Sequence, residues 1–171
     1  KVTEKTNFEL DLSKSYEKLW ENFSPLCKNN IEASAKKRPE FVSDITPREI
    51  LSLFIRNKEK EIRGIKMSEY ERLKNLVNFC MKNKKGRVIG VRAAKRKLIF
   101  GIFIIETVGR KTLLFAVNTP QSRERRIDYF VVNELIKNHS STKTNLDFAG
   151  SSIPSIASFM AFTLESFLSL A

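Results

Sequence analysis

The chain has 171 residues, a length that suits one domain with its own hydrophobic core. Apolar residues make up 42% of it, which argues against a disordered chain, and no apolar run approaches the ~20 residues that a membrane-crossing helix needs. The net charge of +12 favours an anionic partner such as a nucleotide cofactor, RNA or an acidic lipid surface, without choosing among them.

The first part of the chain is predicted to form a strand followed by helices. Phe8–Leu12 alternates apolar and polar residues, as a half-buried strand does. Apolar residues then recur at helical spacing, and Pro25 predicts a kink or a break between two helices. The helical pattern runs to Lys36–Arg38, where Pro39 ends it, and Glu40–Ile45 is predicted to be a short strand.

Two capping boxes predict the next pair of helices. Thr46–Glu49 combines a capping threonine, a proline at the first helical position and a glutamate that can reach back to the cap. Ser68–Glu71 repeats this pattern before a regular apolar stripe. Gly64 and Gly86 are plausible helix ends, the latter because it follows three lysines.

An antiparallel meander of three strands is predicted for the middle of the chain. Its strands are Arg87–Ala93, Leu98–Val108 and Lys111–Val117, separated by short polar turns. Because the second strand is apolar almost throughout, both faces of the sheet should be covered. After a polar loop, a helix over Arg125–Asn138 and a strand over Asn145–Phe148 complete an α+β (mixed α/β) layout, with a central mixed sheet and helices on both faces.

The last strand leads into a small turn of functional interest, Ala149–Ser152. A strand that ends in a Gly/Ser turn leaves backbone N–H groups free, and these can hold an anion or an oxyanion. The turn is also compatible with a plain connector, in which Gly150 supplies a positive φ and the serines cap the following helix.

Cysteine usage is typical of a reducing compartment. Cys27 and Cys80 both fall on predicted apolar helix faces and are interpreted as small core residues. Two cysteines do not make a disulfide framework, and the alternating charges at the start of the chain do not resemble a signal peptide. A cytoplasmic protein is therefore expected.

Three segments, taken in this order, resemble the GNAT acyltransferase fold and, more closely, its Fem-type (FemAB-like) branch of bacterial peptidoglycan-bridge aminoacyl transferases. Leu10–Trp20 (LDLSKSYEKLW) resembles the strand and helix that open the family's domain, and Asn30–Lys37 resembles the basic run that follows. Leu146–Ser151 (LDFAGS), with the apolar residues after it, resembles the family's "lDFeGS" segment. The resemblance spans roughly residues 8–159.

The resemblance implies a single GNAT-like domain over residues 1–171, expected to be the C-terminal half of a longer tandem protein whose N-terminal GNAT-like half is missing. It implies transfer of an acyl or aminoacyl group from an acyl-CoA or aminoacyl-tRNA donor to an amine. Three departures affect the expected site. The loop Thr119–Arg126 lacks the glycine of the family's pyrophosphate-binding turn, Ala149 stands where the family has glutamate, and Phe162–Glu165 replaces the family's closing "FGA".

Acyl transfer needs a held electrophile, donors for the developing oxyanion and a proton acceptor. Within this resemblance, Asp147 is the candidate catalytic base or orienter. The remaining candidates fall into a donor-holding group and an acceptor-cleft group. The donor group is Gln121, Ser122, Arg123, Arg125 and Arg126, and the acceptor group is Gly150, Ser151 and Ser152.

Structural roles remain open for the same residues. The arginines can form a solvated first helical turn, Asp147 can cap the following helix, and His139 can complement the dipole at a helix end. No metal-ligand spacing, nucleophile elbow or Walker loop occurs, so no metal is expected.

Two other functions stay open. Basic clusters recur along the chain, and a tRNA partner would account for phosphate contacts, although aromatic residues do not interleave with the clusters as base stacking requires. A non-catalytic module that supports a partner domain is the other alternative.

Overall fold

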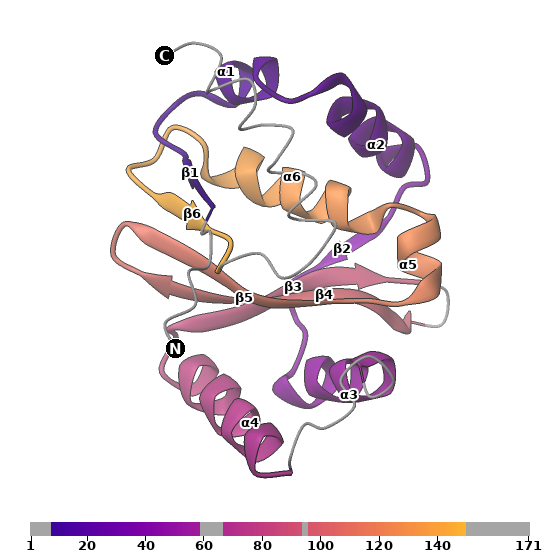
Figure 1. Ribbon diagram of the computed structural model, residues 1–171, viewed down its shortest axis with the longest axis vertical. Helices are drawn as coiled ribbons and strands as arrows, with labels where there is room; N and C mark the ends of the chain where they lie inside the picture. Colours follow the sequence, from indigo (N-terminus) through magenta and orange to yellow (C-terminus); the bar gives the residue numbers. More distant parts are fainter. Residues whose placement is uncertain (1–7, 59–66, 94–95, 150–171) are drawn as a thin grey trace, which may run out of the picture.

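The computed structural model describes residues 8–58, 67–93 and 96–149. Within these ranges a mixed sheet is covered by helices on both faces (Figure 1). The elements, in chain order, are β1 (Glu9–Asp11), α1 (Tyr16–Glu21), α2 (Pro25–Ala35), β2 (Glu40–Val42), α3 (Pro47–Lys58), α4 (Met67–Lys82), β3 (Gly86–Arg92), β4 (Leu98–Thr107), β5 (Arg110–Asn118), α5 (Pro120–Glu124), α6 (Ile127–His139) and β6 (Asn145–Asp147).

The six strands lie in the order β1-β6-β5-β4-β3-β2. The predicted meander is confirmed, because β3, β4 and β5 pair antiparallel in sequence order. The crossover through α6 then returns the chain so that β6 pairs parallel to β5, and β1 closes the edge antiparallel to β6. The sheet is therefore mixed, as expected for a GNAT-like α+β fold.

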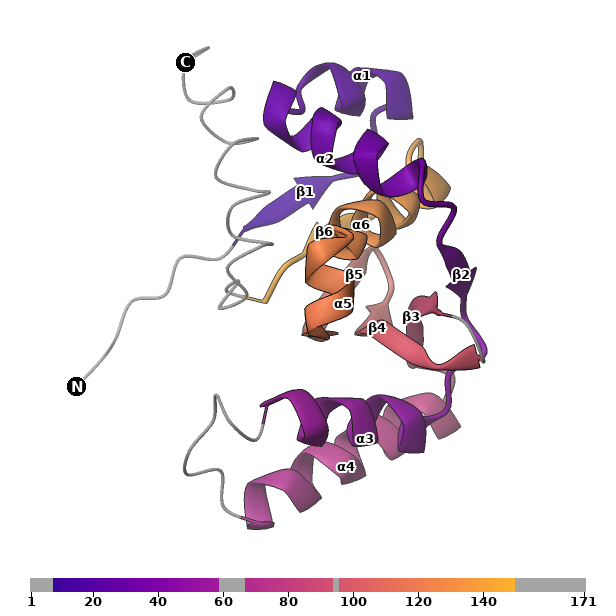
Figure 2. The same cartoon turned by 90° about the vertical axis from the view of Figure 1, so that its right-hand side faces the viewer.

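The sheet separates two hydrophobic cores. Helices α1, α2 and α6 cover one face, and α3 and α4 cover the other, as the two perpendicular views show (Figures 1 and 2). Strand β4 contributes fully buried side chains to both cores, such as Ile102 to the first and Phe103 to the second. Its nearly unbroken apolar sequence follows from this central position.

Local signals account for most helix ends. Pro25 does separate two helices, and Ser24 caps the second through a 3.1 Å bond from the Cys27 N–H. The Thr46–Glu49 capping box forms, with the carboxylate of Glu49 accepting from the Thr46 N–H at 2.9 Å.

Other expectations need correction. Helix α4 begins at Met67, one residue before the predicted cap, and the strand predicted over residues 40–45 is only Glu40–Val42. The chain after α4 turns at Lys84 (φ 55°), and Gly86 is already the first strand residue. The loop that was expected to be irregular contains α5, because Thr119 and Pro120 start a helical turn. Gly64, Gly150, Ser151 and Ser152 lie outside the described residues.

Candidate functional site

The carboxyl end of β5 leads into the short helix α5, which is fixed internally. Thr119 caps α5 by accepting the Ser122 N–H at 3.2 Å. The Ser122 hydroxyl is fully buried and donates to Asn118 Oδ1 at 3.0 Å or to Thr119 O at 2.9 Å. In this structure the predicted donor-holding residue Ser122 therefore shapes the loop from within, whereas Gln121, Arg123 and Arg126 are exposed.

Two arginines adopt left-handed backbone conformations near this loop. Arg126, the N-cap of α6, has φ 56° and ψ 38° and makes no side-chain capping bond. Arg38, three residues beyond the end of α2, has φ 45°. The left-handed region favours glycine or asparagine, so arginine at both positions is unusual.

The end of α2 packs directly against the loop between α5 and α6. Lys37 Nζ donates to the Glu124 carbonyl at 3.4 Å, and Arg125 Nη2 donates to the Lys37 carbonyl at 3.4 Å. These contacts join segments 87 and 88 positions apart. They create one surface, here called the basic corner, from two clusters that are separate in sequence: Lys36, Lys37, Arg38, Arg123, Arg125 and Arg126.

Asp147 lies near the opposite end of β5 from α5, and both of its carboxylate oxygens have polar partners. Its Oδ1 accepts the Ala149 N–H at 2.8 Å, while Oδ2 lies 3.3 Å from Arg110 Nη1 and accepts from the Thr112 hydroxyl at 3.4 Å. Arg110 also pairs with Glu9 of β1. The carboxylate is buried, so this cluster ties β6 to both neighbouring strands and fixes the turn after it.

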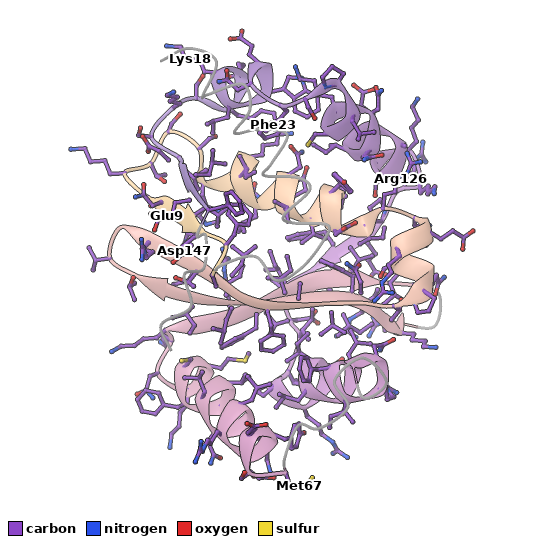
Figure 3. All side chains as sticks on the ribbon, viewed as in Figure 1. Glu9, Lys18, Phe23, Met67, Arg126 and Asp147 are labelled. Atoms are coloured by element: carbon purple, nitrogen blue, oxygen red, sulfur yellow. The ribbon has the colours of Figure 1, made fainter. Side chains whose placement is uncertain are left out.

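The structure does not bring Asp147 and the arginines together. Asp147 pairs with Thr112 in the parallel register, and β5 continues for six further residues to Asn118. At about 3.3 Å per residue the two sites are roughly 20 Å apart along the strand. Figure 3 shows Arg126 beside α2, on the opposite side of the view from Asp147 and Glu9.

Strand β6 runs beside only the first part of β5, at the end away from the basic corner. The two strands pair only over Arg110–Thr112 and Asn145–Asp147. Within the described residues, the rest of β5 has no strand hydrogen-bonded to its β6 side.

A cavity of about 360 Å³ opens between α3 and the start of α5. Its lining comes from α3, from the start of β4 and from the start of α5: Leu53, Arg56, Asn57, Lys97, Ile99, Thr119, Pro120 and Gln121. Of the predicted donor residues only Gln121 lines it. Arg56 and Lys97 lie 41 positions apart in the sequence, and only the fold brings them to one cavity.

His139 takes part in a polar network at the far end of α6. Its Nδ1 bonds to the Leu135 carbonyl at 2.9 Å, and its Nε2 lies 3.1 Å from Arg87 Nη2. Since Arg87 must be the donor, the imidazole is neutral with its proton on Nδ1. Burial lowers the pKa of His139, and the charges of Lys111 and Arg87 add to this effect. The expected location at a helix end is confirmed, but the expected charged role is not.

Neither a metal site nor a membrane span is found among the residues that the structure describes. No group of three or more His, Cys, Asp or Glu side chains is placed to hold a metal ion in those ranges. Every helix in the same ranges falls short of the length or the apolarity needed to cross a bilayer.

Comparison with known proteins places the fold. No protein-family model and no curated protein matches the chain. Among solved structures, the one described as the crystal structure of FemX matches with a TM-score of 0.66 and 10% sequence identity. The chain has a Fem-type fold.

The match covers 92% of this chain and 58% of FemX. The chain thus corresponds to somewhat more than half of the FemX chain, and nearly all of its own length takes part. At this low identity the likeness shows the fold, while the chemistry has to be argued from the residues of this chain.

Proposed function

We propose that this chain is a domain of an acyl or aminoacyl transferase that holds an anionic donor, an acyl-CoA or an aminoacyl-tRNA, at the basic corner. The observation that carries the proposal is the contact of Lys37 with Glu124 and Arg125, which gathers six cations at one end of the sheet. The Fem-type fold supports it, because the sequence resembles Fem-type aminoacyl transferases in the segments that build β1, α1, α2 and β6.

Side chains take over the role that a glycine turn would have in holding phosphate. Arginine presents a planar fork of N–H donors that matches phosphate oxygens, so close approach of the backbone is not required. Arg126 stands at the start of α6, where a cation opposes the helix dipole, and a bound anion relieves this opposition. The geometry therefore suits an anion held by side chains.

Asp147 is assigned a positioning role in this proposal. Both of its oxygens accept hydrogen bonds or face Arg110, which leaves it poorly placed to take a proton. A donor held at the basic corner would need an extended arm of roughly 20 Å to bring its acyl group beside Asp147, measured at ~3.3 Å per strand residue. Such an arm would run along the part of β5 beyond Thr112, where no strand is paired on its β6 side within the described residues.

Binding experiments test the proposal with charge-matched variants. Arg125→Gln combined with Arg126→Gln removes two charges from the basic corner. Lys82→Gln combined with Lys85→Gln removes two charges at the end of α4, on the other face of the sheet. Binding of tRNA and of acetyl-CoA would be measured for both proteins at several salt concentrations.

The corner variant should weaken binding of the donor while the α4 variant leaves it close to that of the original protein. If tRNA is the donor, loss of two phosphate contacts should reduce the salt slope by roughly 1.5. Equal effects of the two variants would mean that only net charge matters. Failure of both ligands to bind would leave the non-catalytic module as the better interpretation.

A further inference from the structure

The cavity between α3, β4 and α5 combines an apolar floor with a polar rim. Leu53 and Ile99 are almost completely buried and belong to the hydrophobic cores, so they form a fixed apolar floor of the cavity. Arg56, Lys97 and Gln121 are exposed and stand at its edge. A few polar groups around an apolar base are typical of small-molecule sites, and ~300 Å³ is the lower end of their size range.

The hydrogen-bonding capacity of the rim is partly used and partly open. Arg56 Nε donates to the Ser52 carbonyl at 3.2 Å, and among the described residues its outer guanidinium nitrogens have no hydrogen-bond partner. Asn57 Nδ2 donates to the Leu53 carbonyl at 2.8 Å, which leaves its Oδ1 as an acceptor. The Thr119 hydroxyl is committed to capping α5.

Charge selects the class of ligand. Within the described ranges no carboxylate forms an ion pair with Arg56 or Lys97, although Arg87, Arg92 and Arg110 are all paired with acidic residues. A phosphate monoester carries a charge of about −1.5 to −2 near neutral pH. Two cationic side chains therefore balance the charge of a phosphate monoester better than the single negative charge of a carboxylate. An amide and a free carbonyl oxygen beside them suit the hydroxyl groups of the body that bears the phosphate.

We propose that this cavity binds the phosphate monoester of a small hydroxylated molecule, of the size of a sugar phosphate or a nucleoside monophosphate. Arg56 and Lys97 hold the phosphate, Gln121 and Asn57 contact hydroxyl groups, and the organic body lies on Leu53 and Ile99. The inference does not depend on the proposed transferase function, because neither Arg56 nor Lys97 belongs to the basic corner.

Isothermal titration of the whole chain with AMP and with glucose 6-phosphate tests the inference, and the two arms distinguish a nucleotide from a sugar source. Adenosine, glucose and inorganic phosphate are the matched probes that lack one half of the ligand. Arg56→Gln and Lys97→Gln should each weaken binding of the phosphate ester by at least about tenfold, as expected for loss of one charge-assisted contact. Lys82→Gln, at the end of α4 and away from the cavity lining, is the control variant and should leave this binding unchanged.

Backbone amide shifts provide the second readout. The ester should move the NMR signals of residues 53–57 and 119–121, with small changes at residues 36–38. The inference is overturned if neither ester binds at about 10 mM, which is weaker than any specific site of this kind should be. It is also overturned if the double variant Arg56→Gln, Lys97→Gln binds as well as the original protein, or if inorganic phosphate binds as tightly as both esters.

Discussion

Two glycines on the neighbouring strands β3 and β4 allow α3, and the loop that precedes it, to pack close to the sheet. Gly90 pairs with Gly101 in the antiparallel register. A Cβ atom at Gly101 would lie only 2.6 Å from Ile50 Cδ1, and Ile50 is fully buried. Gly101→Ala should therefore overpack the α3 side of the core.

The expected cost follows from two opposing terms. Overpacking a tight core costs about 1–3 kcal/mol, while replacing glycine by alanine restricts the unfolded chain and returns about 0.4–1 kcal/mol. The net loss in the free energy of unfolding should be about 1–2 kcal/mol, measured by urea denaturation followed by circular dichroism. The slope of the transition should not change.

A second substitution tests the physical cause. Ile50→Val removes the clashing Cδ1 atom and alone should cost about 0.5–1.5 kcal/mol. With Cδ1 gone, the nearest remaining atoms are Val88 Cγ1 at 3.8 Å and Ile50 Cγ1 at 3.9 Å, which are ordinary contacts. The double variant should be more stable than the sum of the two losses predicts, by about 1 kcal/mol.

Gly90 provides the matched control. Its added Cβ would lie 2.9 Å from Ile45 Cδ1 but only 2.2 Å from the Phe100 carbonyl oxygen, which is backbone of the paired strand. Gly90→Ala should therefore be the more damaging change, and Ile45→Val should not rescue it. Additive losses for Gly101→Ala with Ile50→Val, or a rescue of Gly90→Ala by Ile45→Val, would refute this reasoning.

Three further predictions concern titration, reactivity and backbone strain. The pKa of His139 in the folded protein lies below its ordinary 6.5, so the unfolded state binds a proton first as the pH falls. The free energy of unfolding should therefore be fully retained above pH 6.5 and decrease below it. Thermal melts of His139→Gln should show a smaller decrease over this pH range. Burial raises the pKa of Cys27 to about 12, so the folded protein should resist iodoacetamide at mildly alkaline pH at this residue, and rapid labelling found by mass spectrometry would contradict the burial. Arg126→Asn should raise the free energy of unfolding by roughly 1 kcal/mol, since asparagine tolerates the left-handed conformation and caps helices, while weakening polyanion binding; a loss of stability would show that the arginine supports the fold.

Local chemistry made much of the fold predictable from the sequence. Pro25, the Thr46–Glu49 capping box and the short polar turns between the meander strands each depend on residues close together in the chain, and each prediction was confirmed. The errors also have local causes. Gly86 follows a helix but is needed in β3, where its Cβ would lie 2.9 Å from both Cys80 Cβ and Phe103 Cζ, so close packing between α4 and the sheet rather than a positive φ explains the glycine.

The candidate site was less predictable because its parts come from distant segments. The arginines of residues 123–126 were recognised, but their contact with Lys37 depends on how α2 packs along α6. Arg56 and Lys97 had no common motif, since one lies on α3 and the other precedes β4. The separation of Asp147 from the arginines depends on the parallel register of β5 and β6, which no sequence pattern specifies.

The basic corner contains backbone conformations and a helix start that do not favour the stability of the fold. Arg38 and Arg126 are held in left-handed conformations that cost an L-residue about 1 kcal/mol each, where glycine or asparagine would be relaxed. Arg126 also leaves α6 without a side-chain cap and places a cation at the positive end of the helix. Lys84 and Arg96 adopt left-handed conformations elsewhere in the fold, so what is particular to the basic corner is that such a residue also places a cation at the start of a helix. Unfavourable local features that coincide in this way are expected where function constrains the residues. Together with the contacts of Lys37, this combination supports the proposal that the basic corner holds an anion.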